Sequence, residues 1–206
     1  MSEAQNTAAA RPFPKISSVC VYLGSSGHCA EHHKKTAHDF GQLLAQAGMT
    51  LVYGGGRVGL MGILADSVLQ AGGKVIGIIP EHISKREVSH VDLTELHVVD
   101  SMHTRKQMMV DKSDAFVVLP GGIGTLDELC EVMTWKQLGI HDKPIVIANV
   151  NDYWTPFIKM IDNVIGERFM REDDRHLISE VGSIADVITA LTVAPVQTFD
   201  PSSKWI

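Results

Sequence analysis

The feature that most constrains the fold of this chain is a regular alternation of short apolar runs with helical patterns. Each run is rich in β-branched residues and stops at Gly, Pro or a small polar residue, which is typical of buried strands. The predicted strands are Val19–Leu23, Thr50–Tyr53, Lys74–Ile79, Glu95–Val99, Ala115–Leu119 and Pro144–Val150. The predicted helices are His28–Ala47, Gly59–Ala71, Ser101–Lys112, Gly124–Leu138, Tyr153–Glu167 and Ser183–Leu191. This alternation, with its short connections, predicts an α/β fold in which helices cover both faces of a mostly parallel sheet.

The length and the charge of the chain limit its architecture and its partners. With 206 residues it suits one α/β domain, which we place at residues 16–192. An Ala-rich arm at 1–15, expected to be disordered, precedes the domain, and an irregular tail at 193–206 follows it. The net charge of -6 and the pI near 5.9 argue against a nucleic-acid-binding face, because such a face is basic.

The apolar runs and the cysteines bear on the compartment. The longest apolar runs have only the length of a strand, so the sequence predicts no transmembrane span. The first residues also lack the apolar segment of a signal peptide. The three cysteines, Cys20, Cys29 and Cys130, include no CxxC pair, which favours free thiols in a reducing cytosol. We therefore expect a cytoplasmic protein that does not associate with a membrane.

Gly-rich turns follow several of the predicted strands. In a parallel sheet, ligands bind outside the carboxyl ends of the strands, where such turns lead into helices. The first turn is Gly24–Gly27, the second turn is Gly54–Gly59, and the third turn is Pro120–Thr125. Glycines let the backbone approach a ligand closely, and the helix that follows presents unpaired N–H groups and the positive end of its dipole. One such turn is as often structural as functional, but three at one sheet edge favour an anion site.

The second turn also permits a different interpretation. Gly54, Gly56 and Gly59 match the G-x-G-x-x-G pattern of dinucleotide-binding units, and Glu81 lies near the spacing of a ribose-binding acid. Against this interpretation, the motif follows the second strand rather than the first, and the chain has no room for a separate substrate domain. The residues alone leave both interpretations open.

The third turn is followed by chemically active residues. Thr125 stands at the start of a predicted helix, where its hydroxyl can cap the helix or bind a phosphate. Glu128 lies one helical turn further, so its carboxylate can point back toward the third turn. Arg105 and Lys106 lie near the N-terminus of the preceding helix, where cations oppose the dipole; a bound anion or an acid such as Glu128 would explain them. Because both helices start at the same sheet edge, Arg105 and Glu128 can meet in space.

Three segments together form a pattern that resembles the LOG family, phosphoribohydrolases that release free base from cytokinin riboside 5′-monophosphates. The segments are GGGRVGLMG, SMHTRK and PGGIGTLDELCEVMTWKQLGIHDKP, and the resemblance runs from about Val19 to about Leu191. It implies a Rossmann-like, doubly wound fold, usually in a homodimer, and AMP or its N6-prenylated relatives as substrate. Plant members often carry Tyr where this chain has Ile123, a difference that can alter the contacts to the base or the sugar.

The resemblance also implies roles for individual residues. Arg105 and Glu128 match the catalytic pair of the family. The substrate-binding positions match at Ser25, Gly54, Gly55, Lys106, Gly121, Gly122, Gly124 and Thr125. Members have often been labelled lysine decarboxylases, but no lysine here has the context of a pyridoxal-phosphate site, so we expect no cofactor. We also expect no metal, because His28 and His32 have helical spacing without a matching carboxylate motif.

The expected reaction is hydrolysis of the N-glycosidic bond of a nucleoside 5′-monophosphate, giving free base and ribose 5-phosphate. Cleavage develops positive charge on the sugar, which a carboxylate can stabilise, and we expect Glu128 to do this. Arg105 is expected to orient the phosphate or Glu128, or to assist the leaving base. The alternatives are a base-exchanging, deoxyribosyltransferase-like enzyme and a nucleotide- or cofactor-binding carrier without catalysis.

Overall fold

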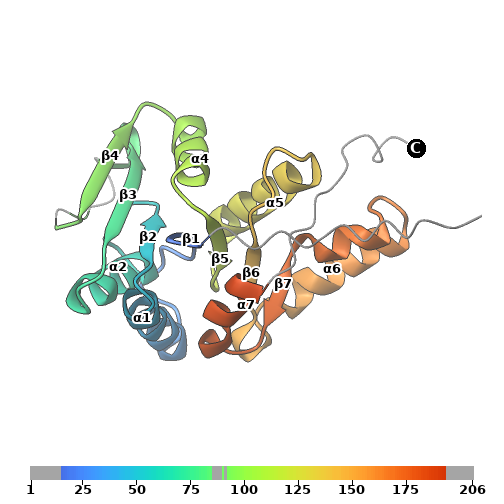
Figure 1. Cartoon of the computed structure of the whole chain (residues 1–206), viewed down its shortest axis with the longest axis horizontal. Helices are drawn as coiled ribbons and strands as arrows, with labels where there is room; N and C mark the ends of the chain where they lie inside the picture. The colour runs from blue at the N-terminus through green and yellow to red at the C-terminus, as the bar shows by residue number, and fades with distance from the viewer. Residues whose placement is uncertain (1–14, 85–89, 91, 194–206) are drawn as a thin grey trace, which may run out of the picture.

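The computed structural model describes residues 15–84, 90 and 92–193. Across this part of the chain, seven strands form one sheet in the order β4-β3-β2-β1-β5-β6-β7, and every neighbouring pair is parallel (Figure 1). The strands are β1 Ser18–Tyr22, β2 Thr50–Tyr53, β3 Val75–Pro80, β4 Glu95–Val99, β5 Ala115–Val118, β6 Ile145–Ala148 and β7 Ser179–Val181. The predicted α/β fold with a parallel, doubly wound sheet is confirmed.

Helices cover both faces of the sheet (Figure 1). One face is covered by α1 Glu31–Gln46, α2 Leu60–Gln70 and α7 Val187–Val193, and the other by α4 Met102–Asp111, α5 Ile123–Gln137 and α6 Thr155–Gly166. In β1, Val19 and Val21 belong to the first core, while Cys20 and Tyr22 belong to the second. Successive residues of a strand point to opposite faces, so a run that is apolar throughout is buried on both.

The order of the strands places the carboxyl ends of β1 and β5 side by side. The chain adds β2, β3 and β4 on one side of β1 and then returns through α4 to β5 on the other side (Figure 1). In the register of the pair, Tyr22 lies opposite Val118, and the Gly24 N–H donates to the Pro120 carbonyl at 3.1 Å. The first and third turns therefore meet at the point where the winding reverses, which is where ligands of such sheets bind.

The elements that the sequence prediction missed are all short. All six predicted strands and the predicted helices occur; β2 and β4 have the predicted bounds, and the ends of the others are shifted. The prediction missed β7, α3 Glu81–Ser84, η1 Val150–Asp152 and η2 Glu172–Leu177. Elements of three to six residues are too short to show a period. The last predicted helix divides into η3 Ile184–Asp186 and α7. Of the arm at 1–15 and the tail at 193–206, all but one residue each lies outside the described residues.

No helix in the described part of the chain is long and apolar enough to cross a membrane.

Candidate active site

The start of α4 positions the arginine of the predicted pair. Ser101 caps the helix, and its hydroxyl accepts a hydrogen bond from the Thr104 N–H at 3.1 Å. This start places Arg105 in the first turns of α4, where its Nε donates to the Ile78 carbonyl of β3 at 3.2 Å. The bond to a strand backbone fixes the direction in which the guanidinium points.

The third turn leads directly into α5. Gly122 is the N-cap residue and makes no side-chain cap, so of the two roles predicted for the Thr125 hydroxyl, capping the helix is excluded and binding a phosphate stays a prediction. The helix begins one residue earlier than predicted, and Thr125 is its third residue. The Thr125 side chain is buried against Gly121, where the hydroxyl occupies the space that a Cβ on Gly121 would need. The hydroxyl and the turn are thus packed against each other.

Arg105 and Glu128 meet in an ion pair that joins α4 to α5. Arg105 Nη1 lies 2.9 Å from Glu128 Oε1, and the two side chains are only 12% and 10% exposed. Burial raises the pKa of the Glu128 carboxyl above its ordinary value, and the nearby charges of Arg105 and Lys106 act in the opposite direction. The Glu128 carboxylate is therefore buried, and the positive charge of Arg105 stabilises its ionised form.

Gly54 makes this pair possible. A Cβ built on Gly54 would fall on the guanidinium of Arg105 and would also approach Met61 Sδ at 3.5 Å. The first glycine of the G-x-G-x-x-G pattern therefore accommodates a protein side chain. The pattern also follows β2, whereas the strands at the reversal of the sheet are β1 and β5. Both observations weigh against the dinucleotide interpretation, in which these glycines face a pyrophosphate.

A cavity of about 300 Å³ lies over the ion pair, and we call it the first cavity. Arg105 and Glu128 both line it. The predicted binding residues that also line it are Ser25, Gly54, Gly122, Gly124 and Thr125. Apolar side chains, among them Met61, Pro80 and Ile83, complete the wall. The cavity thus combines helix-start amides, an ion pair and an apolar surface.

The other predicted binding residues do not line the first cavity. Lys106 Nζ lies 2.7 Å from Asp127 Oδ2 and 3.4 Å from Glu131 Oε2, both on α5. Gly55 packs near Ile79, and its carbonyl accepts from the His90 N–H at 3.2 Å. Gly121 lines a second cavity, of about 400 Å³.

The second cavity adjoins the first, because Gly24, Ser25 and Gly122 line both. Its remaining wall includes His33 of α1 and Tyr153, which precedes α6. Sequence reasoning missed Tyr153, along with Pro80 and Ile83 of the first cavity. These residues belong to no motif, and only the packing of the elements brings them to the site.

The described residues contain no group of three or more His, Cys, Asp or Glu side chains that could hold a metal ion. His32 instead packs against His33, with ring centroids 4.0 Å apart.

Solved structures share the fold at low sequence identity. The molybdenum cofactor carrier protein of Chlamydomonas reinhardtii is 20% identical, with a TM-score of 0.65 over 85% of this chain and 96% of that chain. The molybdenum cofactor binding protein of Rippkaea orientalis is 21% identical, with a TM-score of 0.64 over 85% of this chain and 94% of that chain. At these identities the similarity establishes the architecture alone.

Sequence comparisons reach much higher identity. A family model described as "Possible lysine decarboxylase" matches residues 61–191. The cytokinin riboside 5′-monophosphate phosphoribohydrolase of Rhodococcoides fascians is 42% identical over 90% of this chain and 93% of its own length. The probable phosphoribohydrolase LOGL1 of Oryza sativa is also 42% identical, over 99% of this chain and 92% of its own length. The chain therefore belongs to the LOG family of cytokinin riboside 5′-monophosphate phosphoribohydrolases, as the PGGIGTLDE segment and the Arg-Lys pair indicate.

Proposed function

We propose that this enzyme hydrolyses the N-glycosidic bond of nucleoside 5′-monophosphates, AMP or cytokinin riboside 5′-monophosphates, and releases free base and ribose 5-phosphate. The observation that carries the proposal is the Arg105–Glu128 ion pair at the wall of the first cavity, beside the start of α5. In this proposal the start of α5 binds an anion, and the buried Glu128 carboxylate lies one helical turn further along the helix. This spacing suits a nucleoside 5′-monophosphate, because its reacting carbon and its phosphate are both attached to one ribose.

The phosphate binds at the third turn in this proposal. The first N–H groups of α5 have no partner within the helix and lie at the positive end of its dipole. Gly122, Gly124 and Thr125 present this end to the first cavity, and Ser25 of the first turn lies at the same wall. The phosphate does not react, but the binding energy of its contacts fixes the ribose over Glu128, where the reaction takes place.

Glu128 acts at the anomeric carbon. The C1′–N bond breaks with its electron pair on the base, and positive charge grows on the sugar, where the carboxylate stabilises it. A water molecule adds its oxygen to C1′ and gives up one proton, for which the Glu128 carboxylate is the nearest base. The departing base takes up a proton, and ribose 5-phosphate carries the new hydroxyl.

Arg105 holds Glu128 in this role. Its Nη1 pairs with the carboxylate while its Nε is bound to the Ile78 carbonyl, so the carboxylate is both oriented and kept ionised. We assign Lys106 an indirect part in substrate binding, because its Nζ bridges to Asp127 and Glu131 and adds positive charge near Glu128.

The test is the release of free base from a panel of nucleoside 5′-monophosphates, measured by chromatography. The panel contains AMP, its N6-prenylated relatives and monophosphates with other bases, each beside its unphosphorylated nucleoside. The monophosphates are expected to react far faster. Equal rates on nucleoside and monophosphate would refute the phosphate anchor, and no release from any compound would refute the hydrolase.

The same assay separates the rival functions. A second base is added to the reaction, and a new nucleotide among the products would indicate base exchange through a covalent Glu128 intermediate. Tight binding of a nucleotide with no release of base would indicate a carrier. The buried Arg105–Glu128 pair favours the enzyme, because a carrier has no need of a carboxylate at the sugar.

We further infer that the enzyme is cytoplasmic and, as the LOG resemblance implies, a homodimer. All three cysteines are free thiols, which agrees with a reducing compartment. Light scattering on the purified protein and fractionation of the source cells test these points.

A further inference from the structure

We propose that Tyr153 is a positioning residue of the third turn, whose hydroxyl fixes the Gly121–Gly122 peptide for phosphate binding. Tyr153 Oη donates to the Gly121 carbonyl at 2.6 Å, although 32 positions separate the two residues. The role rests on the proposed function, because it requires that the third turn holds the phosphate of the substrate.

The geometry of a peptide bond gives the contact its consequence. In a trans peptide the C=O and the following N–H point in opposite directions, and the plane is rigid. The described residues contain no cis peptide bond. Since the Gly121 carbonyl points to Tyr153, the Gly122 N–H points away from Tyr153. Gly122 immediately precedes α5 and lines the first cavity, so its amide joins the N–H groups at the start of the helix.

The third turn is held from its other side as well. The Pro120 carbonyl accepts from the Gly24 N–H at 3.1 Å, so consecutive carbonyls of the turn are bound to different parts of the fold. A turn rich in glycine has many accessible backbone conformations, and each fixed peptide removes some of them. A site ordered before the ligand arrives binds it more tightly, because less entropy is lost on binding.

The loop that carries Tyr153 has a strained backbone. Asn151 and Asp152, consecutive residues just before Tyr153, have φ values of 54° and 58°. Asn and Asp tolerate this left-handed region better than most residues, yet it remains unfavourable for them. Such strain persists where the surroundings determine the conformation, and it gathers at functional sites. Here the strained turn ends at the tyrosine that contacts Gly121.

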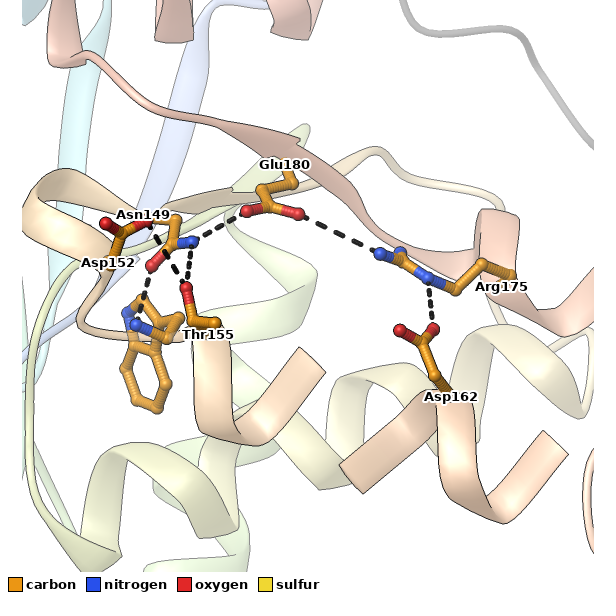
Figure 2. A network of polar contacts seen from close by, with 7 residues as sticks. Asn149, Asp152, Thr155, Asp162, Arg175 and Glu180 are labelled. Carbon is orange, nitrogen blue, oxygen red and sulfur yellow. Dashed lines mark hydrogen bonds and ion pairs between the residues drawn. The ribbon is translucent and has the colours of Figure 1, made fainter. Parts of the chain in front are cut away.

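A buried asparagine holds this loop in place. Asn149 Oδ1 accepts from the Trp154 N–H at 2.7 Å, and its Nδ2 donates to Thr155 Oγ1 at 3.0 Å and to Glu180 Oε1 at 2.7 Å. Figure 2 shows Asn149 between Thr155 and Glu180. The bonds span the loop from β6 to the start of α6 and tie it to β7, so they fix the two ends between which Tyr153 lies.

The network continues beyond the loop. Arg175 Nη2 lies 3.8 Å from Glu180 Oε2, and its Nε donates to Asp162 Oδ1 of α6 at 2.8 Å (Figure 2). The Tyr153 ring itself makes edge contacts with Trp154 and with His33 of α1. Polar and aromatic contacts thus support the tyrosine from α1, α6 and β7, none of which belongs to the third turn.

The experiment uses the full chain with Tyr153→Phe, which keeps the ring and removes the hydroxyl. KM and kcat are measured with AMP and with adenosine, and the affinity for ribose 5-phosphate is measured by calorimetry. We expect KM for AMP and the Kd of ribose 5-phosphate to rise about 3- to 10-fold, as for the loss of one hydrogen bond. The kcat for AMP and the rate on adenosine are expected to stay unchanged, because adenosine has no phosphate.

Thr134→Val is the matched control. Thr134 Oγ1 donates to the Cys130 carbonyl at 2.7 Å on α5, so the variant also loses a hydroxyl-to-carbonyl bond, but one that lies outside the third turn. It should behave as wild type. An unchanged KM and Kd in Tyr153→Phe would overturn the positioning role and leave the hydrolase standing. An equal loss on AMP and adenosine would reduce Tyr153 to a structural residue. A wild-type protein that binds no ribose 5-phosphate and reacts equally with AMP and adenosine would overturn the phosphate anchor, and with it the role of Tyr153, while base release would still support the hydrolase.

Discussion

Arg105 Nη1 lies 2.9 Å from Glu128 Oε1, while Arg105 Nε donates to the Ile78 carbonyl at 3.2 Å. The guanidinium therefore connects α4, α5 and β3 at the edge of the sheet where the first cavity opens. A hydrogen bond between charged groups is shorter and stronger than a neutral one, and here it has little competition from water. The orientation of the Glu128 carboxylate is set in this way by the backbone of a strand.

Glu128→Gln should abolish most of the turnover and retain nucleotide binding. The amide is neutral and cannot stabilise the positive charge on the sugar, so we expect kcat to fall by about 10²- to 10⁴-fold. Base release by chromatography and AMP affinity by calorimetry measure the two effects. Glu31→Gln is the control, since Glu31 lies on α1, pairs with Lys34 and lines neither the first nor the second cavity. Wild-type turnover in Glu128→Gln would remove Glu128 from its role.

Gly54→Ala should damage the ion pair without unfolding the protein. The new methyl group would fall on the guanidinium of Arg105, which must move away from Glu128. A displacement of about 1 Å in a catalytic group can lower the rate about 10²-fold, and we expect a loss of this order. Gly27→Ala, in the first turn, is the control, because a Cβ there meets no atom within 4 Å. Equal activity of the two variants would contradict the proposed packing of Arg105.

As the pH is lowered, the enzyme should lose activity at a higher pH than that at which an ordinary glutamate becomes protonated. Burial raises the pKa of Glu128 in the free enzyme, and the reaction needs the carboxylate, so kcat/KM should rise with pH through a range that lies above the ordinary pKa of a glutamate. Arg105 opposes this rise of the pKa, and Arg105→Gln should therefore move the acid limb to still higher pH. The pH profiles of kcat/KM for both proteins provide the measurement. A limb that moves to lower pH in the variant would contradict this electrostatic account.

The folded protein should lose stability as the pH falls from about 6.5 to about 4 because of His141. Its Nδ1 accepts from the Lys143 N–H at 3.2 Å, and its Nε2 lies 3.0 Å from the Val132 carbonyl, an arrangement that suits the neutral ring. Burial lowers the pKa of His141 to about 4.

The sign follows from proton uptake. Below about pH 6.5 the unfolded chain protonates this histidine first, so the free energy of unfolding decreases by as much as about 3 kcal/mol as pH 4 is approached. Urea unfolding at a series of pH values measures the effect. His141→Gln keeps a donor near the Val132 carbonyl and does not titrate, so its stability should depend less on pH across this window. The same pH dependence in both proteins would exclude His141 as the cause.

Local patterns in the sequence determined the elements and the candidate pair. The apolar run at β1 predicts a strand buried on both faces, and its alternate residues do lie in opposite cores. PGGIGT followed by Glu128 predicts a helix start beside a carboxylate, since these residues are neighbours along one helix. Such features depend on residues that are only a few positions apart, and these separations can be read directly from the sequence.

Only the tertiary structure decided which distant groups share the site. The sequence predicts that Gly54 lies close to a nucleotide; the fold places Gly54 at the wall of the first cavity and also packs the Arg105 guanidinium against it. Lys106 follows Arg105 in the chain, yet it points to Asp127 and Glu131, because adjacent residues of a helix face different directions. Tyr153 belongs to no motif and reaches Gly121 only because β6 lies beside β5. Strand order and helix packing depend on contacts between distant residues, and no local pattern encodes these.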